Sequence, residues 1–151
     1  MKTQRQLIIH ELMPALNQIG QMQKQGSLML NQKVGYALSR AVTAIIKMKK
    51  DSDVFQKSQM DKFVEVVGDQ YQTVDEGNQK KWKFKSEADE IAFVTAMNEY
   101  NEQEVDWNPM KISNDDLKQV HNIPIDILAM LDAYELTTDL AIAQPKLSII
   151  K

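Results

Sequence analysis

The chain has 151 residues, of which 43% are hydrophobic and 26% are charged, as in an ordinary globular protein of one domain. It contains no cysteine, which excludes disulfide bonds and thiolate metal sites. The net charge of −3 is unevenly distributed: residues 1–50 carry eight basic side chains and one acid, whereas residues 51–151 carry ten basic side chains and 20 acids. This division bears on how the chain packs or on which partner it contacts.

The N-terminal segment lacks the pattern of a secretory signal. Its apolar runs are short and are interrupted by His10 and Glu11, whereas a signal peptide needs about 7–15 uninterrupted apolar residues. No stretch of the chain approaches the roughly 20 apolar residues of a membrane-spanning helix. We therefore expect a cytosolic protein without membrane contact.

The spacing of apolar residues predicts a pair of helices over residues 4–50. The first, over residues 4–23, contains Pro14, which should kink it or end its first half because proline lacks an amide donor. The second, over residues 28–50, gives the strongest helical signal in the chain. Its apolar stripe consists of Leu30, Val34, Ala37, Leu38, Ala41, Ile45 and Met48.

Basic side chains accompany this stripe. Lys33, Arg40 and Lys47 are spaced by seven residues and form a row along one side of the predicted helix. Lys49 and Lys50 join Lys47 in what would be the last turn, where cations complement the helix dipole. These five residues are the candidate interaction surface of the chain.

Residues 53–112 are predicted to form a helix–hairpin–helix region. The spacing of Ser58 and Asp61 resembles a capping box, so a third helix is expected to begin at Ser58. The turn sequence at residues 75–78 is followed by aromatic residues that alternate with lysines. That alternation predicts a half-buried strand in a β-hairpin.

Two further helices are expected. One begins at Ser86 with acidic residues in its first turn, and the last occupies about residues 124–136, followed by a tail. Between them, residues 105–107 and 110–112 are expected to form another short strand pair. These elements predict a mainly α fold of the α+β class, a bundle of four to five helices with a small antiparallel β element, in one domain over residues 1–151.

Motifs for catalysis, cofactor binding and metal ligation are not found. The two histidines, His10 and His121, are far apart and have no third conventional ligand near them in the sequence. There is no glycine-rich phosphate loop and no nucleophile elbow. Acid pairs such as Asp115 and Asp116 are interpreted as solvated charge. We expect no catalytic residue, no cofactor and no metal.

The candidate interaction surface has three interpretations. We favour packing against acidic residues of the same fold or of a neighbouring subunit. Binding to a nucleic-acid backbone through counterion release is the second, although a pI of 5.4 is unlike that of strong nucleic-acid binders. In the third interpretation these basic side chains are simply solvated and have no partner. The aromatic residues are expected in the core rather than in a platform for stacked bases: Trp82, Phe84, Phe93, Tyr100 and Trp107.

The central part of the chain has a recognisable organisation: a helical pair, an acidic turn, an aromatic strand, and a helix that leads to an acidic-aliphatic strand. The positions that carry it are Tyr71, Asp75, Gly77, Trp82, Phe84, Asn98, Glu104 and Val105. In this organisation, about residues 28–112 resemble small uncharacterised proteins encoded in tailed-bacteriophage genomes. The resemblance implies a viral origin and a non-enzymatic role, and it transfers no catalytic residue.

We therefore expect a non-enzymatic bacteriophage protein that acts by protein–protein contact, in the head, neck or tail of the virion or during its assembly. Its partners would be further copies of itself or other phage structural proteins, in the host cytoplasm or the virion. Opposite charges on the two segments suit head-to-tail association, in which different surfaces meet. The alternative is a phage accessory protein that binds nucleic acid or a host factor through the basic helix 33–50.

Overall fold

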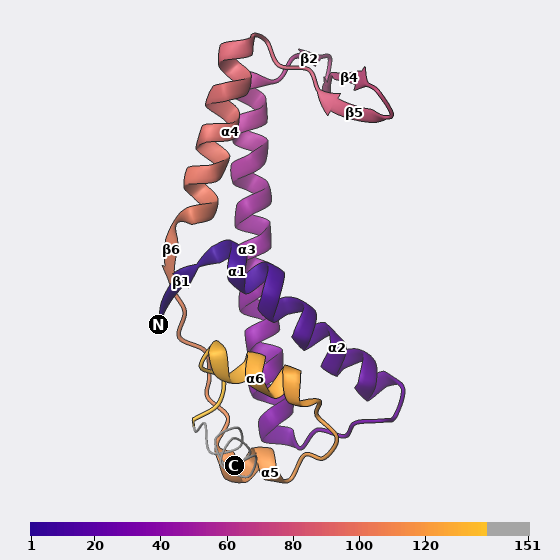
Figure 1. Ribbon diagram of the computed structural model, residues 1–151, viewed down its shortest axis with the longest axis vertical. Helices are drawn as coiled ribbons and strands as arrows, with labels where there is room; N and C mark the ends of the chain where they lie inside the picture. Colours follow the sequence, from indigo (N-terminus) through magenta and orange to yellow (C-terminus); the bar gives the residue numbers. More distant parts are fainter. Residues whose placement is uncertain (139–151) are drawn as a thin grey trace, which may run out of the picture. The chain divides into compact units, whose positions relative to one another are not determined.

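The computed structural model describes residues 1–138 and shows a chain that is about 59% helical with small antiparallel strand pairs (Figure 1). This confirms the predicted mainly α, α+β class. The chain divides into two compact units: unit 1 contains residues 1–48 and the chain from residue 104 onward, and unit 2 contains residues 49–103. The prediction of a single domain remains a prediction.

The first helical segment of unit 1 contains a wide turn immediately before its proline. Helix α1 (Arg5–Leu7) continues through the π-helical turn η1 (Ile8–Leu12) into α2 (Met13–Lys24). In η1 the N–H of Met13 donates to the carbonyl of Ile8, five residues earlier. A proline in a regular helix clashes with the preceding turn, and a π-turn provides the extra room. The disruption expected at Pro14 is therefore present as a π-turn.

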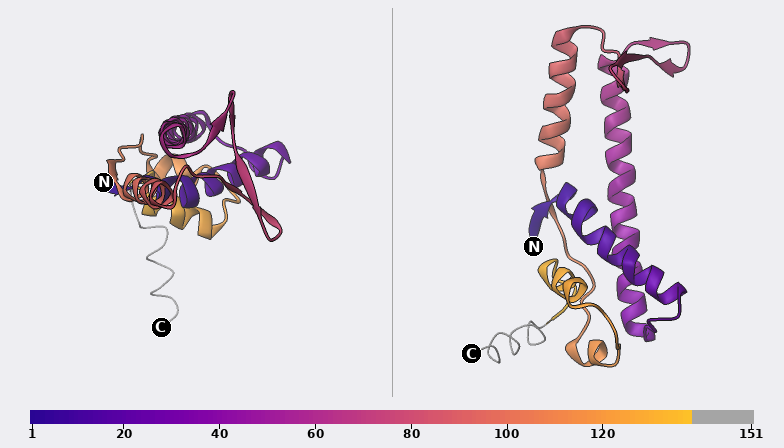
Figure 2. Two further views of the ribbon diagram at one scale, coloured as in Figure 1. Left: turned by 90° about the horizontal axis from the view of Figure 1, so that it is seen from above. Right: turned by 45° about the vertical axis from the view of Figure 1, so that its right-hand side comes forward.

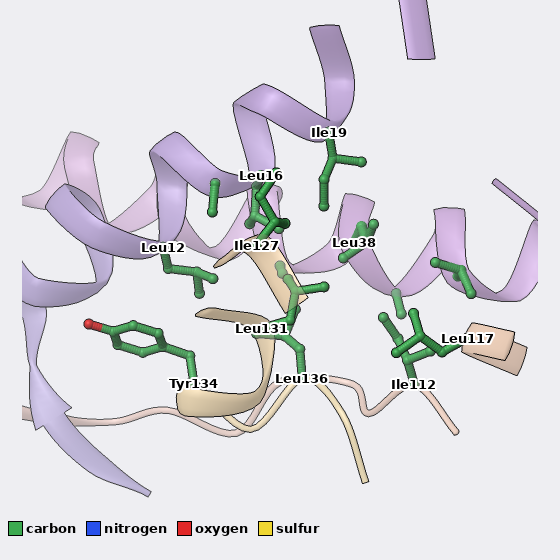
Figure 3. Close-up of a cluster of buried hydrophobic side chains, with 14 of the residues drawn as sticks. Leu12, Leu16, Ile19, Leu38, Ile112, Leu117, Ile127, Leu131, Tyr134 and Leu136 are labelled. Carbon is green, nitrogen blue, oxygen red and sulfur yellow. The ribbon is translucent and has the colours of Figure 1, made fainter. Parts of the chain in front are cut away.

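The core of unit 1 joins α2, α3 (Gln32–Phe63) and α6 (Ile125–Ala133). Figure 3 shows side chains from these three helices, and from the segment around Ile112, converging on one cluster. The predicted stripe of α3 is confirmed, since its five central residues are buried: Val34, Ala37, Leu38, Ala41 and Ile45. Removing such apolar surface from water drives folding, at roughly 25 cal/mol per Å².

One predicted strand pair is wrong. Strand β6 (Glu104–Asp106) pairs with β1 (Lys2–Gln4) and not with residues 110–112. The chain after β6 packs through Trp107, whose indole N–H is buried and donates to the carbonyl of Tyr134 at 2.8 Å. Ile112 instead forms a parallel bridge with Thr137. The N-terminal residues could not be placed beside β6 by local reasoning, because about 100 residues separate the two strands.

The C-terminal part of unit 1 contains two short helices. Helix α5 (Asn114–Lys118) was not predicted; Ser113 caps it by accepting a hydrogen bond from the N–H of Asp116 at 3.1 Å. Helix α6 follows Pro124 as expected, but it ends at Ala133 rather than near residue 136. Of the predicted tail, residues 139–151 lie outside the described residues.

Helix α3 is continuous where the sequence predicted two helices (Figures 1 and 2). Ser58 does not cap a new helix. Its hydroxyl lies inside α3 and donates to the carbonyl of Phe55 at 2.6 Å, which is the usual bond of a serine within a helix. The helix ends at Phe63, where the backbone N–H of Lys85 donates to the Phe63 carbonyl at 3.0 Å. The Lys85 ammonium also donates to the carbonyl of Lys62 at 3.1 Å.

Unit 2 contains the predicted hairpin. Strand β2 (Val66–Val67) pairs with β3 (Gln70–Tyr71), and β4 (Thr73–Glu76) pairs with β5 (Gln79–Trp82). Gly77 has φ +63° and is the first of the two residues that join β4 to β5. A two-residue turn of type II′ needs positive φ at that position, which glycine adopts without strain.

Helix α4 (Glu87–Glu102) begins as predicted, with Ser86 accepting a hydrogen bond from the N–H of Asp89 at 3.1 Å. Its predicted apolar face is half-buried: Ala92, Phe93, Ala96, Met97 and Tyr100. Tyr100 stacks on Phe55 of α3 with 4.1 Å between ring centroids, and Phe93 contacts Phe84 at 5.3 Å. Since α4 has no buried residue, aromatic pairs hold this unit together more than a closed core does.

Candidate interaction surfaces

The basic row Lys33, Arg40 and Lys47 lies on the exposed side of α3 in unit 1. At a rise of 1.5 Å per residue, its members are about 10 Å apart along the helix. Lys33 forms a loose ion pair with Asp116 (Nζ to Oδ1, 3.9 Å) while its side chain remains 79% exposed. Surface pairs of this kind contribute little to stability. The row is therefore presented to solvent, and the ion pair at Lys33 is weak.

Arg40 is oriented by its own helix. Its Nη1 donates to the hydroxyl of Tyr36 at 3.2 Å, and its guanidinium carbon lies 5.8 Å from the centroid of the same ring. Tyr36 is itself 53% exposed. The pair is one helical turn apart, a spacing at which side chains on a helix surface meet. Arg40 is consequently held along the helix with its charge still accessible.

Lys49 and Lys50 follow the row along α3. Both lie in unit 2, inside α3, which continues to Phe63, so the expectation that they occupy the last turn is wrong. Lys49 is two positions after Lys47 and faces another side of the helix, whereas Lys50 is three positions after Lys47, a spacing at which side chains are neighbours. Both are exposed. The five predicted site residues are thus one row of three, with Lys50 beside its last member and Lys49 on another side of the helix.

An open groove of about 600 Å³ adjoins the row in unit 1. One wall is formed by Ala41, Ala44 and Met48 of α3, and the opposite wall by residues 106–110. Arg40 and Asp106 contribute opposite charges to its lining. The sequence did not reveal this groove, because residues 105–107 and 110–112 were predicted to pair with each other as strands.

Unit 2, whose residues are all described, buries very little. Only Gln59, Met60 and Val64 are buried within it. In contrast, large apolar side chains are exposed on α3, on the strands and on α4: Val54, Val66, Val67, Val74, Trp82, Ile91 and Val94. Scattered exposed apolar residues are normal on a protein surface, so the distinctive feature of unit 2 is that it buries only three residues while exposing seven large apolar side chains.

The β4–β5 hairpin carries opposite charges on its two strands. Asp75 and Glu76 belong to β4, whereas Lys80 and Lys81 belong to β5. Asp75 lies directly opposite Lys80, and the Lys81 ammonium contacts a Glu76 carboxylate oxygen at 2.7 Å. The hydrogen bond and the charge of Glu76 raise the pKa of Lys81. Every residue of both strands is exposed, so the predictions of a half-buried strand and of Trp82 in the core are wrong.

Three contacts fix the base of the hairpin. Trp82 meets Tyr71 edge to face with ring centroids 6.0 Å apart, and Lys83 pairs with Glu65 at 2.9 Å. The hydroxyl of Tyr71 donates to the carboxylate of Asp61 in α3, and this hydrogen bond is the main cause of the raised pKa of Tyr71. The hairpin is thereby anchored at its base, while its strands extend away from the helices of unit 2 (Figure 2).

Within residues 1–138, no group of three or more metal-ligating side chains is close enough to hold an ion. In the same range, no helix combines the length and apolar character that crossing a membrane would require. No protein-family model, curated protein or solved structure matches the chain.

Proposed function

We propose that this protein is a non-enzymatic bacteriophage protein that acts by protein–protein contact, in the virion or during its assembly, and that unit 2 provides the contact. The observation that carries the proposal is the imbalance of unit 2, which exposes seven large apolar side chains and buries three residues. The bacteriophage assignment rests on the resemblance of residues 28–112 to phage-encoded proteins.

The physical argument starts from the hairpin. An isolated two-stranded hairpin is marginally stable in water, and its free strand edges readily pair with other chains. Trp82 of β5 is 39% exposed, and Val67 of the neighbouring strand β2 is 68% exposed. Covering such side chains with a partner would remove apolar surface from water and would add backbone hydrogen bonds. A role in assembly accounts for both features, because the partner would complete a core that unit 2 lacks.

Copurification tests this proposal. Cells producing the phage that encodes this chain would be lysed, and particles and assembly intermediates would be purified and probed for the protein. We expect the protein in one of these fractions, and the double variant Val67→Ala/Trp82→Ala should be depleted from it. The matched control is Met29→Ala in unit 1, where the replaced side chain is 84% exposed. Absence of the wild-type protein from every particle and intermediate would contradict the proposal.

A second function is favoured by one observation. Between residues 32 and 50, α3 carries five exposed basic side chains and no acid. A phage accessory protein could use this basic segment to bind nucleic acid or a host factor. Arg40→Glu/Lys47→Glu should then abolish salt-sensitive retention on DNA or RNA, whereas Lys111→Glu, an exposed lysine outside α3, should not. Failure of the wild type to bind either nucleic acid at low salt would exclude that form of the function.

A further inference from the structure

The β4–β5 hairpin has two free edges. Among residues 1–138 it forms a sheet of only two strands, so each strand has one side without a neighbour. The N–H of Lys83 donates to the carbonyl of Gln72 at 2.8 Å, which fixes the alternation of bonds along the ladder. By that alternation, Thr73 and Asp75 direct their backbone groups away from β5, and Lys80 and Trp82 direct theirs away from β4.

The charges of the two edges differ in sign. Lysines on an edge strand normally prevent pairing with other chains, because like charges would meet. A pair of β5 strands from two copies would place lysines beside lysines, and a pair of β4 strands would place acids beside acids. Pairing β4 of one copy with β5 of another would instead place Asp75 and Glu76 beside lysines. Opposite charges on neighbouring strands stabilise a sheet.

We propose that this hairpin joins copies of the chain head to tail, with the β4 edge of one copy pairing with the β5 edge of the next. The partner is therefore a second copy of this chain. The inference rests on the proposed function, because it names the partner for the contact surface of unit 2. A head-to-tail contact uses two different surfaces, so repetition produces a closed ring or an open filament rather than a twofold dimer. The alternating strands β5–β4–β5–β4 would form one continuous sheet.

Charge reversal tests this arrangement by sedimentation velocity over a wide range of protein concentration. The basic variant is Asp75→Lys/Glu76→Lys, and the acidic variant is Lys80→Glu/Lys81→Glu. We expect the wild type to associate, more weakly at high salt. Each variant alone should associate at least about tenfold more weakly, because both of its edges carry one sign of charge. An equimolar mixture of the two variants should associate again, since basic edges then meet acidic edges.

A third variant separates the contact from the integrity of the hairpin. The swapped variant Asp75→Lys/Glu76→Lys/Lys80→Glu/Lys81→Glu keeps opposite charges across its own strands and should associate like the wild type. Cross-strand NMR contacts between Thr73 and Trp82 report whether each variant forms the hairpin. If a hairpin-forming variant of single sign associates like the wild type, or if the mixture stays dissociated, the inference is wrong.

A monomeric wild type at every concentration would also overturn the inference. The proposed function would nevertheless stand if that protein copurified with phage particles, because its partner would then be a different protein. Conversely, a protein that self-associates in a charge-dependent way but is absent from the particles would support the inference and contradict the proposed function. The two failures are therefore distinguishable.

Discussion

Val64 is buried where the chain leaving α3 meets the chain leaving β5, a contact that we call the junction of unit 2. It is 0% exposed and bridges to Phe84 immediately after the end of α3. Replacing it with alanine removes two methyl-sized groups, which costs about 1.6 kcal/mol of transfer free energy at roughly 0.8 kcal/mol each. The cavity left behind adds to this loss, so we expect Val64→Ala to destabilise the junction by about 2–3 kcal/mol. Val67→Ala is the matched control, because Val67 lies three residues away and is 68% exposed.

Native-state hydrogen exchange measures this effect locally, which matters because two compact units need not unfold together. The informative amides are those of Glu65 and Lys85, which donate to the carbonyls of Lys83 and Phe63 across the junction. Each 1.4 kcal/mol is a factor of ten, so Val64→Ala should accelerate their exchange about 30- to 150-fold. Val67→Ala should change it little, as surface substitutions stay within about 0.5 kcal/mol. Equal acceleration by both variants would refute the burial argument.

Three further predictions concern caps, turns and pH. Ser86→Ala should destabilise α4 by about 1 kcal/mol because the helix loses its cap, whereas Ser58→Ala should be neutral or slightly stabilising because Ser58 lies inside α3. Circular dichroism during urea unfolding compares the stability of the two variants. Equal losses of stability would contradict a continuous α3. Gly77→Ala should weaken the hairpin by about 1–2 kcal/mol because φ is positive at this residue, and NMR should show this as a loss of cross-strand contacts. The control Gly20→Ala, inside α2, should instead stabilise unit 1 by up to about 1 kcal/mol. Burial is the largest cause of the raised pKa of Tyr134, and the hydrogen bond from its hydroxyl to the Glu11 carboxylate is the next. The contribution of Tyr134 to stability is therefore complete below the ordinary tyrosine pKa of about 10 and is lost as the pH rises above that value. Tyr134→Phe should lessen the loss of stability at alkaline pH, and an unchanged alkaline unfolding profile would show that another group titrates.

Several elements were predictable because their determinants are local. The apolar stripe of α3 follows from the 3.6-residue period, and the start of α4 follows from a serine whose side chain binds an N–H three residues later. The β4–β5 hairpin was also predictable, since Gly77 at its turn favours the required positive φ. Each of these features depends on residues within a few positions of one another.

The features that were predicted wrongly depend on residues that are far apart in the sequence. Ser58 and Asp61 have the spacing of a cap, yet the helix continues through them. Phe55 lies between the two predicted helices, and in the continuous helix α3 its ring stacks on Tyr100. Tertiary packing of this kind overrides local signals, which are worth only about 1 kcal/mol. Similarly, no local pattern could place β1 beside β6, because strand pairing over a long separation is decided by the rest of the fold.

The candidate interaction surface also combines features set by local sequence with features set by the tertiary structure. The sequence by itself determined which residues are basic, that Lys33, Arg40 and Lys47 share one side of a helix, and that the chain is mainly helical, because charge and periodicity are local properties. Only the tertiary structure decided that Lys49 and Lys50 lie in the middle of α3, that a groove adjoins Arg40, and that the described residues leave the hairpin of unit 2 uncovered. Exposure depends on which distant segments pack against a residue, and a sequence pattern does not contain that information.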